Sequence, residues 1–261
     1  MTLGIMAALQ EEILELIEII RRQGDGEVRR IGMRDYYAGS IDGQSCVVVL
    51  ARIGKVAAAA TTVTLIREFG VSEIVFSGVA GGLAQHVNVG DVVIADRLIQ
   101  HDMDGRPIFP RYEIPLLAIS EFETTATLRQ ELESAARHFL SHDFSQQIPA
   151  KVMVEFGLTR PQLHTGMIVS GDQFIGLHQN ASQLRNDLPA AFAVEMEGAA
   201  VAQICHEFGV PCAILRTISD RADANAHIDF NQFLIKVASH YSNGILRRFL
   251  SQRSNKSEVE S

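Results

Sequence analysis

The sequence contains no tryptophan and only 3 cysteines among its 261 residues. The cysteines, Cys46, Cys205 and Cys212, are odd in number and lie at no spacing that a metal site uses. The sequence therefore predicts neither a disulfide framework nor a zinc centre. Cys46 and Cys205 lie in apolar runs and are interpreted as buried thiols. Free thiols are typical of a reducing compartment, so we expect a cytoplasmic protein.

Long apolar runs and excess positive charge are also missing. The first twelve residues have no basic segment and become acidic at Glu11, so they are not expected to act as a signal peptide. No apolar run is long enough to cross a bilayer. The net charge of −8 argues against a sequence-independent nucleic-acid surface. We therefore expect neither a membrane nor a nucleic acid as partner.

The sequence does contain ample apolar material for a core, because 47% of its residues are hydrophobic. Its length fits one α/β domain, and no internal repeat or linker divides it. We predict a single domain over residues 1–251. Residues 252–261 are mostly polar and are expected to form a disordered tail.

Apolar runs alternate with helical patterns along the chain and give about six candidate strands. Asp42-Gly43 predicts a hairpin, because this dipeptide favours a tight turn between strands. Gly209 and Pro211 are expected to end a helix, since glycine suits a helix C-terminus and proline cannot continue one. Other expected strands cover residues 3–9, 73–76, 91–96 and 166–169, and other expected helices begin at 10 and cover 55–69, 125–140 and 229–250.

The segment 192–220 combines two apolar strands with charged ends. The first strand ends at Glu195 and Glu197, and the second ends at Arg216 and Asp220. In open α/β sheets, ligands bind outside the carboxyl ends of the strands, so these side chains are a candidate site. An ion pair combined with acids that cap the intervening helix explains the same pattern equally well.

Three further strand-to-helix junctions carry candidate residues. They are Glu12, the glycine-rich segment 78–82 and the segment 172–174. Segment 78–82, interpreted as a turn, lets a ligand approach the backbone but matches neither GxGxxG nor a P-loop. Alone, Glu12 is more simply an acid that favours its helix start, and Phe174 a core residue. Acids at several strand ends indicate glycosidic-bond cleavage, which needs a proton donor and a base.

Two other features are weaker. Lys55 stands at the start of a predicted helix, where it would either meet an anion or lie exposed. His101, Asp102 and Asp104 lie in a loop rich in glycine and proline, residues 101–115. Nothing in the sequence completes a ligand set around them, so we expect no metal ion.

Six motifs stand in order along the chain: LGIMAALQEEI, RIGKVAAAA, GVAGGL, IVSGDQFI, AVEMEGAAVA and LRTISDRAD. Together they resemble the 5'-methylthioadenosine/S-adenosylhomocysteine nucleosidases of the purine nucleoside phosphorylase superfamily. This resemblance implies an α/β fold: a single domain with a central mixed β-sheet, partly closed into a barrel and flanked by α-helices. It also implies a homodimer that hydrolyses 5'-substituted adenine nucleosides with water and without metal or cofactor.

The resemblance implies a role for each matching residue. Glu12 matches the general base that activates water, and Asp220 matches the acid that protonates adenine N7. Ser219 would orient Asp220, and Arg216 would help to hold the water and nearby carboxylates. Phe230 matches an aromatic wall of the pocket.

The remaining matches contact the sugar and the base. Met196 and Glu197 match the ribose contacts, with Glu197 taking the sugar hydroxyls. Phe174 matches the ring that stacks on adenine, the Ile175 backbone matches the reader of the purine edge, and Gly81 matches a backbone contact to substrate. A carboxylate near the sugar would stabilise an oxocarbenium-like transition state.

Three alternatives to the hydrolase remain open, and one of them is a plain adenine-binding regulatory module, which would bind without turnover. A purine nucleoside phosphorylase would need an anion site, and segment 78–82 contains no arginine. A non-catalytic adenine nucleoside-binding protein would be expected to lose Glu12, Glu197 or Asp220, and all three are present. The substrate is equally open among methylthioadenosine, S-adenosylhomocysteine, 5'-deoxyadenosine and aminodeoxyfutalosine.

Overall fold

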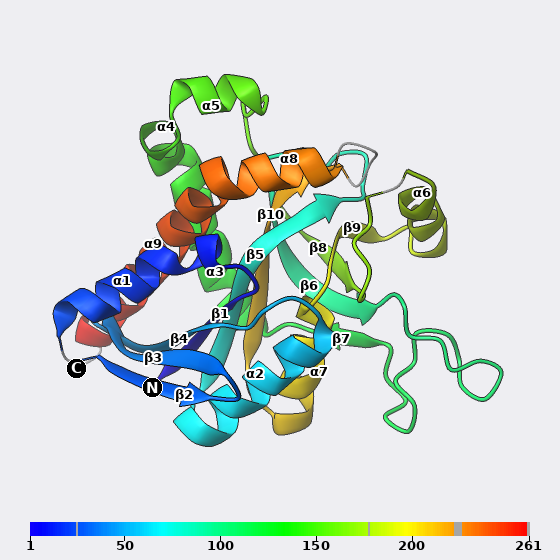
Figure 1. Cartoon of the computed structure of the whole chain (residues 1–261), viewed down its shortest axis with the longest axis horizontal. Helices are drawn as coiled ribbons and strands as arrows, with labels where there is room; N and C mark the ends of the chain where they lie inside the picture. The colour runs from blue at the N-terminus through cyan, green and yellow to red at the C-terminus, as the bar shows by residue number, and fades with distance from the viewer. Residues whose placement is uncertain (25, 177, 222–225, 260–261) are drawn as a thin grey trace.

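The computed structural model describes residues 1–24, 26–176, 178–221 and 226–259, and within them ten strands form one mixed sheet (Figure 1). The strands are β1 (Leu3–Ala7), β2 (Glu27–Ile31), β3 (Arg34–Ile41), β4 (Gln44–Leu50), β5 (Glu73–Gly82), β6 (Val92–Gln100), β7 (Glu121–Glu123), β8 (Leu163–Ser170), β9 (Ala191–Glu195) and β10 (Cys212–Asp220).

Five of these strands close into a barrel. The sheet runs β10-β6-β8-β9-β5, and β5 also pairs in parallel with β10, which joins the two ends of that series. From β5 the sheet continues through β1 and β4 to β3 and β2. The expected mixed sheet, partly closed into a barrel, is thereby confirmed.

Helices cover the sheet on both sides. Helices α1, α3 and α9 share one apolar core with the strands, whereas α2 and α7 pack together over a second core. The helices are α1 (Leu14–Gln23), α2 (Lys55–Phe69), α3 (Ala126–His138), α4 (Phe144–Gln147), α5 (Ala150–Glu155), α6 (His178–Asp187), α7 (Gly198–Phe208), α8 (Ala226–Phe233) and α9 (Ser239–Val259), with a 3₁₀ turn η1 (Gln10–Glu12) and π-helical turns η2 (Phe139–Asp143) and η3 (Leu234–Ala238).

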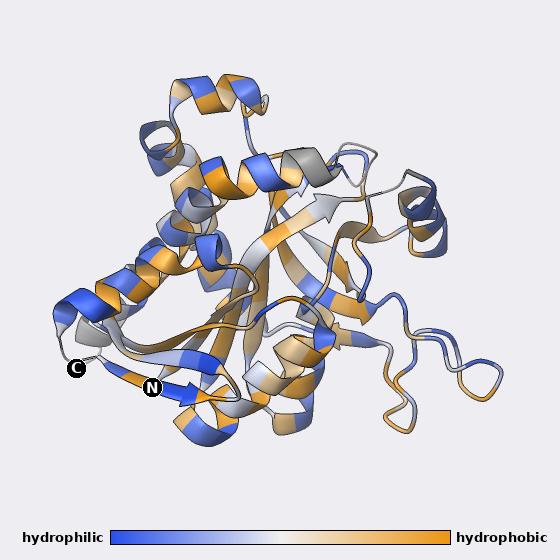
Figure 2. Cartoon of the chain, in the orientation of Figure 1, coloured by the Kyte–Doolittle hydropathy of each residue, from blue (hydrophilic) through white to orange (hydrophobic). Residues whose placement is uncertain are grey.

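The hairpin between β3 and β4 follows from its turn residues. Asp42 and Gly43 both have positive φ, 48° and 82°, as a type I′ turn requires. The two strands pair antiparallel from Ile41–Gln44 to Tyr36–Val49, which confirms the predicted hairpin. Figure 2 shows the helices striped with polar and apolar residues, as expected of helices that bury one face.

Strand β5 is longer than the sequence predicts. Segment 78–82, expected as a turn, instead continues the strand to Gly82. Its backbone is bonded on both sides, because β10 pairs with it as far as Gly81 and β9 pairs with Gly81 and Gly82. Pairing between distant segments decides strand formation here, and glycine content does not reveal it.

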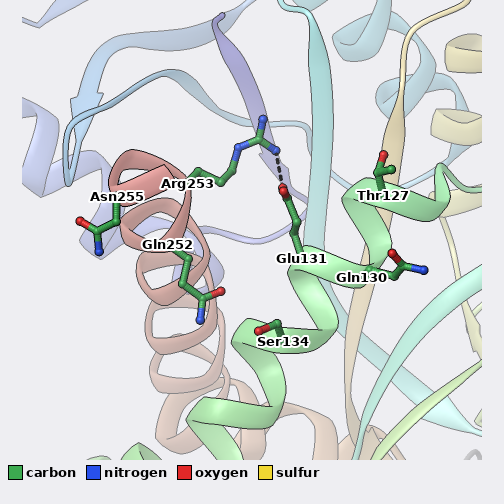
Figure 3. A pocket seen from close by; sticks show the side chains of 7 residues that line it. All are labelled: Thr127, Gln130, Glu131, Ser134, Gln252, Arg253 and Asn255. Atoms are coloured by element: carbon green, nitrogen blue, oxygen red, sulfur yellow. Dashed lines mark hydrogen bonds and ion pairs between the residues drawn. The ribbon is translucent and has the colours of Figure 1, made fainter. Parts of the chain in front are cut away.

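The last helix extends into the segment that the sequence predicts as a polar tail. Helix α9 covers residues Ser239–Val259, and the predicted tail begins at residue 252. Arg253 anchors these last turns by pairing with Glu73 on β5 and, at 3.1 Å, with Glu131 on α3 (Figure 3). None of the helices in the described ranges is both long and apolar enough to cross a membrane.

Candidate active site

A cavity of about 340 Å³ opens at the carboxyl ends of β1, β5, β9 and β10. This volume lies within the range of ~300–1,000 Å³ that small-molecule sites occupy, and the strand ends are where α/β sheets bind ligands. Its lining residues are Ala8, Leu9, Glu12, Ile53, Gly78, Val79, Ala80, Phe174, Glu195, Met196, Glu197, Arg216, Ser219 and Phe230.

Most of the residues singled out from the sequence gather here. Three of the ten do not line the cavity: Gly81 lies within β5, Ile175 is buried in an apolar cluster, and Asp220 lies beside the lining residue Ser219. The seven that line it are Glu12, Phe174, Met196, Glu197, Arg216, Ser219 and Phe230.

Arg216 and Glu195 form a buried ion pair in the cavity wall. The Arg216 Nη2 lies 2.5 Å from Glu195 Oε2, and Arg216 is only 1% exposed. Glu195 also accepts hydrogen bonds from the Ser170 hydroxyl and from the backbone N–H of Glu197 and Gly198 at the start of α7. Glu195 therefore fits the structural interpretation, an acid that pairs with arginine and caps a helix.

Glu197 is held differently, although it stands only two residues away. Its Oε1 accepts the Gly54 N–H at 2.8 Å, and its Oε2 lies 4.0 Å from Arg216 Nη2. Burial, with the nearby Glu195 charge, raises the pKa of Glu197 to about 8. The charge state of Glu197 is therefore open to change near neutral pH.

This pKa predicts an unusual pH dependence of stability. The folded-state pKa of Glu197 is about 8 and its ordinary value 4.5, so the folded protein alone keeps this proton between those pH values. The free energy of unfolding should fall as pH rises through this window. In thermal melts at pH 5, 7 and 9, the melting temperature of Glu197→Gln should therefore rise relative to that of the wild type as pH rises.

The matched control is Glu27→Gln, at an exposed position on β2. Its melting temperature should differ from that of the wild type by the same amount at each pH. A pH-independent difference for Glu197→Gln would contradict the raised pKa.

Glu12 both caps its helix and faces the cavity. Its Oε2 accepts the N–H groups of Ala8 and Leu9 at 3.1 and 2.9 Å, while its Oε1 accepts the Val79 N–H of β5 at 3.0 Å. Burial raises the pKa of Glu12 to about 7, although these N–H groups and Arg216 favour the ionised form. Helix capping and an active role are thus compatible at this residue.

Glycine at position 78 permits this arrangement. A Cβ there would lie 3.1 Å from both Arg216 Nη1 and Glu12 Oε1, which is tighter than an ordinary contact. The absence of a side chain lets the arginine and the acid approach the same stretch of β5.

Ser219 and Asp220 end strand β10 at an irregularity of the sheet. The pairing with β5 shifts register between Ile218 and Asp220, so Ser219 is the extra residue of a bulge. Bulges redirect side chains, and here the Ser219 hydroxyl donates to Asp220 Oδ2 at 2.8 Å. Asp220 is 3% exposed and pairs in register with Gly81.

Glu12 and Asp220 are attached to the same strand. Glu12 binds the backbone of Val79, and Asp220 pairs with Gly81, two residues further along β5. Two residues of a strand span about 7 Å. The backbone positions that hold these two acids are therefore close together at one end of the barrel.

Two aromatic rings form another wall. Phe174, 49% exposed, and Phe230 of α8 stand with ring centroids 5.8 Å apart and planes at 75°. A half-exposed phenyl ring at a cavity offers a face on which a flat heterocycle can stack.

Several lining residues were not singled out from the sequence as site residues. Ile53 lies one residue before Gly54, in the motif RIGKVAAAA, and Gly78–Ala80 lie in GVAGGL. Ala8 and Leu9 directly follow β1. The motifs that contain them are the available signal, but no single residue type marks an apolar lining position.

The loose acidic cluster near residue 101 is occupied by a lysine. Lys55 Nζ lies 2.6 Å from Asp102 Oδ1, and its side chain is only 16% exposed, so it is neither free for an anion nor solvated. Asp104 pairs with Arg106. Within the described ranges no group of three or more His, Cys, Asp or Glu side chains could hold a metal ion.

The chain is similar in sequence to known nucleosidases over most of its length. Residues 2–251 match the family model of the phosphorylase superfamily. An aminodeoxyfutalosine nucleosidase of Helicobacter pylori is 34% identical over 250 residues, covering 96% of this chain and 98% of that protein. A 5'-methylthioadenosine/S-adenosylhomocysteine nucleosidase of Anoxybacillus flavithermus is 32% identical over 243 residues, covering 93% and 95%.

Solved structures of nucleosidases also superpose on the chain over most of its length. The 5'-methylthioadenosine/S-adenosylhomocysteine nucleosidase of Neisseria meningitidis, in complex with methylthio-immucillin-A, superposes with a TM-score of 0.83 at 30% identity, covering 96% of this chain and 99% of that one. A futalosine hydrolase of Helicobacter pylori gives a TM-score of 0.80 at 34% identity, covering 96% and 97%.

Proposed function

This chain belongs to the 5'-methylthioadenosine/S-adenosylhomocysteine nucleosidase family of the phosphorylase superfamily, and from that premise we propose that it hydrolyses 5'-substituted adenine nucleosides with Asp220 as acid and Glu12 as base. Family membership makes it a hydrolase of N-glycosidic bonds. The substrate and the residue roles are our proposal. The observation that carries them is the attachment of Glu12 and Asp220 to β5 two residues apart, beside one cavity.

Asp220 is assigned to the leaving group. Adenine departs readily only when N7 carries a proton, so an acid must face the base. The Ser219 hydroxyl bonds to one oxygen of Asp220, which supports a fixed orientation for the other. Stacking of adenine on the Phe174 ring would orient the base so that the edge carrying N7 can face this acid.

Glu12 is assigned to the water. A pKa of about 7 suits a base at neutral pH, because a useful fraction is ionised and the group still accepts a proton readily. Its Oε1 is fixed by the Val79 N–H on the cavity wall, which supports a defined position for the attacking water.

Glu197 is assigned to the sugar. Positive charge that develops on the ribose ring would favour the ionised form of this buried acid, and the resulting carboxylate would stabilise the transition state. The adjoining Met196 and the aliphatic side chains of Leu9, Ile53 and Val79 give the cavity an apolar wall, which supports a thioether or other apolar 5' substituent.

The test is a substrate panel with and without phosphate. We expect free adenine and the free sugar from methylthioadenosine or S-adenosylhomocysteine in buffer lacking phosphate, with 5'-deoxyadenosine and aminodeoxyfutalosine ranked alongside by kcat/KM. A sugar 1-phosphate formed only with phosphate would identify a phosphorylase. Binding of adenine nucleosides without any adenine release would identify a non-catalytic relative.

A further inference from the structure

Lys55 is a charged side chain that the proposed chemistry does not use. It begins helix α2, and its Nζ donates to Gln100 Oε1 at 3.0 Å and to Asp102 Oδ1 at 2.6 Å. The Asp172 Oδ2 lies 4.0 Å away. A lysine that is 16% exposed among such partners has a defined position, unlike a solvated surface lysine.

Asp172 is tied to Lys55 by two routes. Its Oδ1 accepts the Lys55 backbone N–H at 2.9 Å, and its own N–H donates to Asp102 Oδ2 at 2.9 Å. Asp102 thus bridges the Lys55 ammonium and the Asp172 backbone. Burial would raise the pKa of Asp102, but the Lys55 ammonium and this N–H hold it below its ordinary value, so Asp102 is charged at neutral pH.

Asp172 lies two residues before Phe174, and Ile175 lies one residue after it. Ile175 is buried in an apolar cluster with Leu83 and Ile99, whereas the Phe174 ring is half exposed. The ring is therefore held by a polar anchor on one side and an apolar anchor on the other. Loss of the hydrogen bonds at Asp172 would therefore loosen segment 172–174, while Ile175 stays in its apolar cluster.

The start of α2 also contacts Glu197, another lining residue of the cavity. Gly54 has φ of 99°, a conformation that favours glycine, and its N–H donates to Glu197 Oε1. Consecutive N–H groups, of Gly54 and Lys55, thus hold Glu197 and Asp172. The start of α2 therefore positions both the acid assigned to the sugar and the segment that carries the ring assigned to the base.

We propose that Lys55 is a positioning residue, which through Asp102 and Asp172 fixes the segment 172–175 and so sets the affinity of the site for adenine. The inference rests on the proposed function, because it takes Phe174 as the ring that meets the purine. Lys55 touches neither Glu12 nor Asp220 in this role, so it acts on binding of the base.

Lys55→Gln tests this role by removing the charge while keeping a hydrogen-bonding side chain. We expect KM for the adenine nucleoside and Ki for free adenine both to rise about tenfold, as for a lost charge-assisted hydrogen bond, with kcat within about threefold of the wild type. Asp102→Asn should act in the same direction. The double variant should be little worse than either single one, because both break one network.

The control is Lys151→Gln on α5, which removes the same charge at an exposed position. Unchanged adenine Ki in folded Lys55→Gln and Asp102→Asn would overturn the inference, as would a loss of kcat at constant KM. If one variant does not fold, the other decides. If the wild type releases adenine and both variants keep its adenine Ki, only the role of Lys55 is contradicted. If the wild type neither binds nor releases adenine, the proposed function is contradicted together with the role of Lys55.

Discussion

Replacing Asp220 with asparagine should lower kcat for adenine nucleosides by at least about a hundredfold, the lower end of what one proton-transfer group contributes. The carboxamide has nearly the same shape and still accepts the hydrogen bond from Ser219, but it cannot deliver a proton to N7. Since Asp220 is buried beside the cavity, the effect should appear mainly in kcat. Steady-state release of adenine measures it.

Two comparisons separate chemistry from folding in this variant. Asp35→Asn, a half-exposed position on β3, removes one acid elsewhere and should leave turnover unchanged. An analogue with carbon in place of N7 should bind to the wild type and to Asp220→Asn alike and be cleaved by neither. A folded Asp220→Asn with normal turnover would remove this residue from the acid role.

Replacing Glu12 with glutamine should also cost at least about a hundredfold in kcat, because an amide cannot take the proton of the attacking water. The neighbouring Glu11 provides the matched control, since it stands in the same helical turn but is exposed. Glu11→Gln should retain full activity. Equal activity of both variants would leave Glu12 with helix capping alone.

The pH profile gives an independent measure of the same residue. A base works when ionised, and the pKa of Glu12 is raised to about 7. For the wild type, kcat/KM should therefore fall tenfold per pH unit below about 7, as the free enzyme takes up this proton. The residual activity of Glu12→Gln should lack that limb, and a limb that persists there would assign it to another group.

The parts of the fold that local sequence determines were predictable. Asp42-Gly43 specifies its hairpin, and the apolar runs locate most buried strands. Strand β2 has no apolar run that would predict it, because it lies at the edge of the sheet and is largely exposed. Strand β7 has only three residues, which is too short for a pattern to predict it. The extent of β5 depends on β9 and β10, which are far away in the sequence. The C-terminal turns of α9 depend likewise on the ion pairs of Arg253.

The sequence predicts that the site lies at the strand ends, but it does not predict how the environments of the individual acids differ. Glu195 and Glu197 stand two residues apart with the same chemistry. Their difference comes from Ser170, Arg216 and Gly54, which three distant segments bring to them. No local pattern at Glu195 or Glu197 carries that information, and the same holds for the partners of Lys55.

Strand β5 bonds to β1, β9 and β10 and holds Glu12 through Val79 and Asp220 through Gly81. Any shift of that strand moves both acids together and so preserves the spacing between them. Meanwhile two loops of the chain between β6 and β7 project from the body of the molecule (Figure 1). Insertions and substitutions can accumulate in such projections over evolutionary time, so descendants of this architecture can vary there while they inherit the spacing of Glu12 and Asp220 intact.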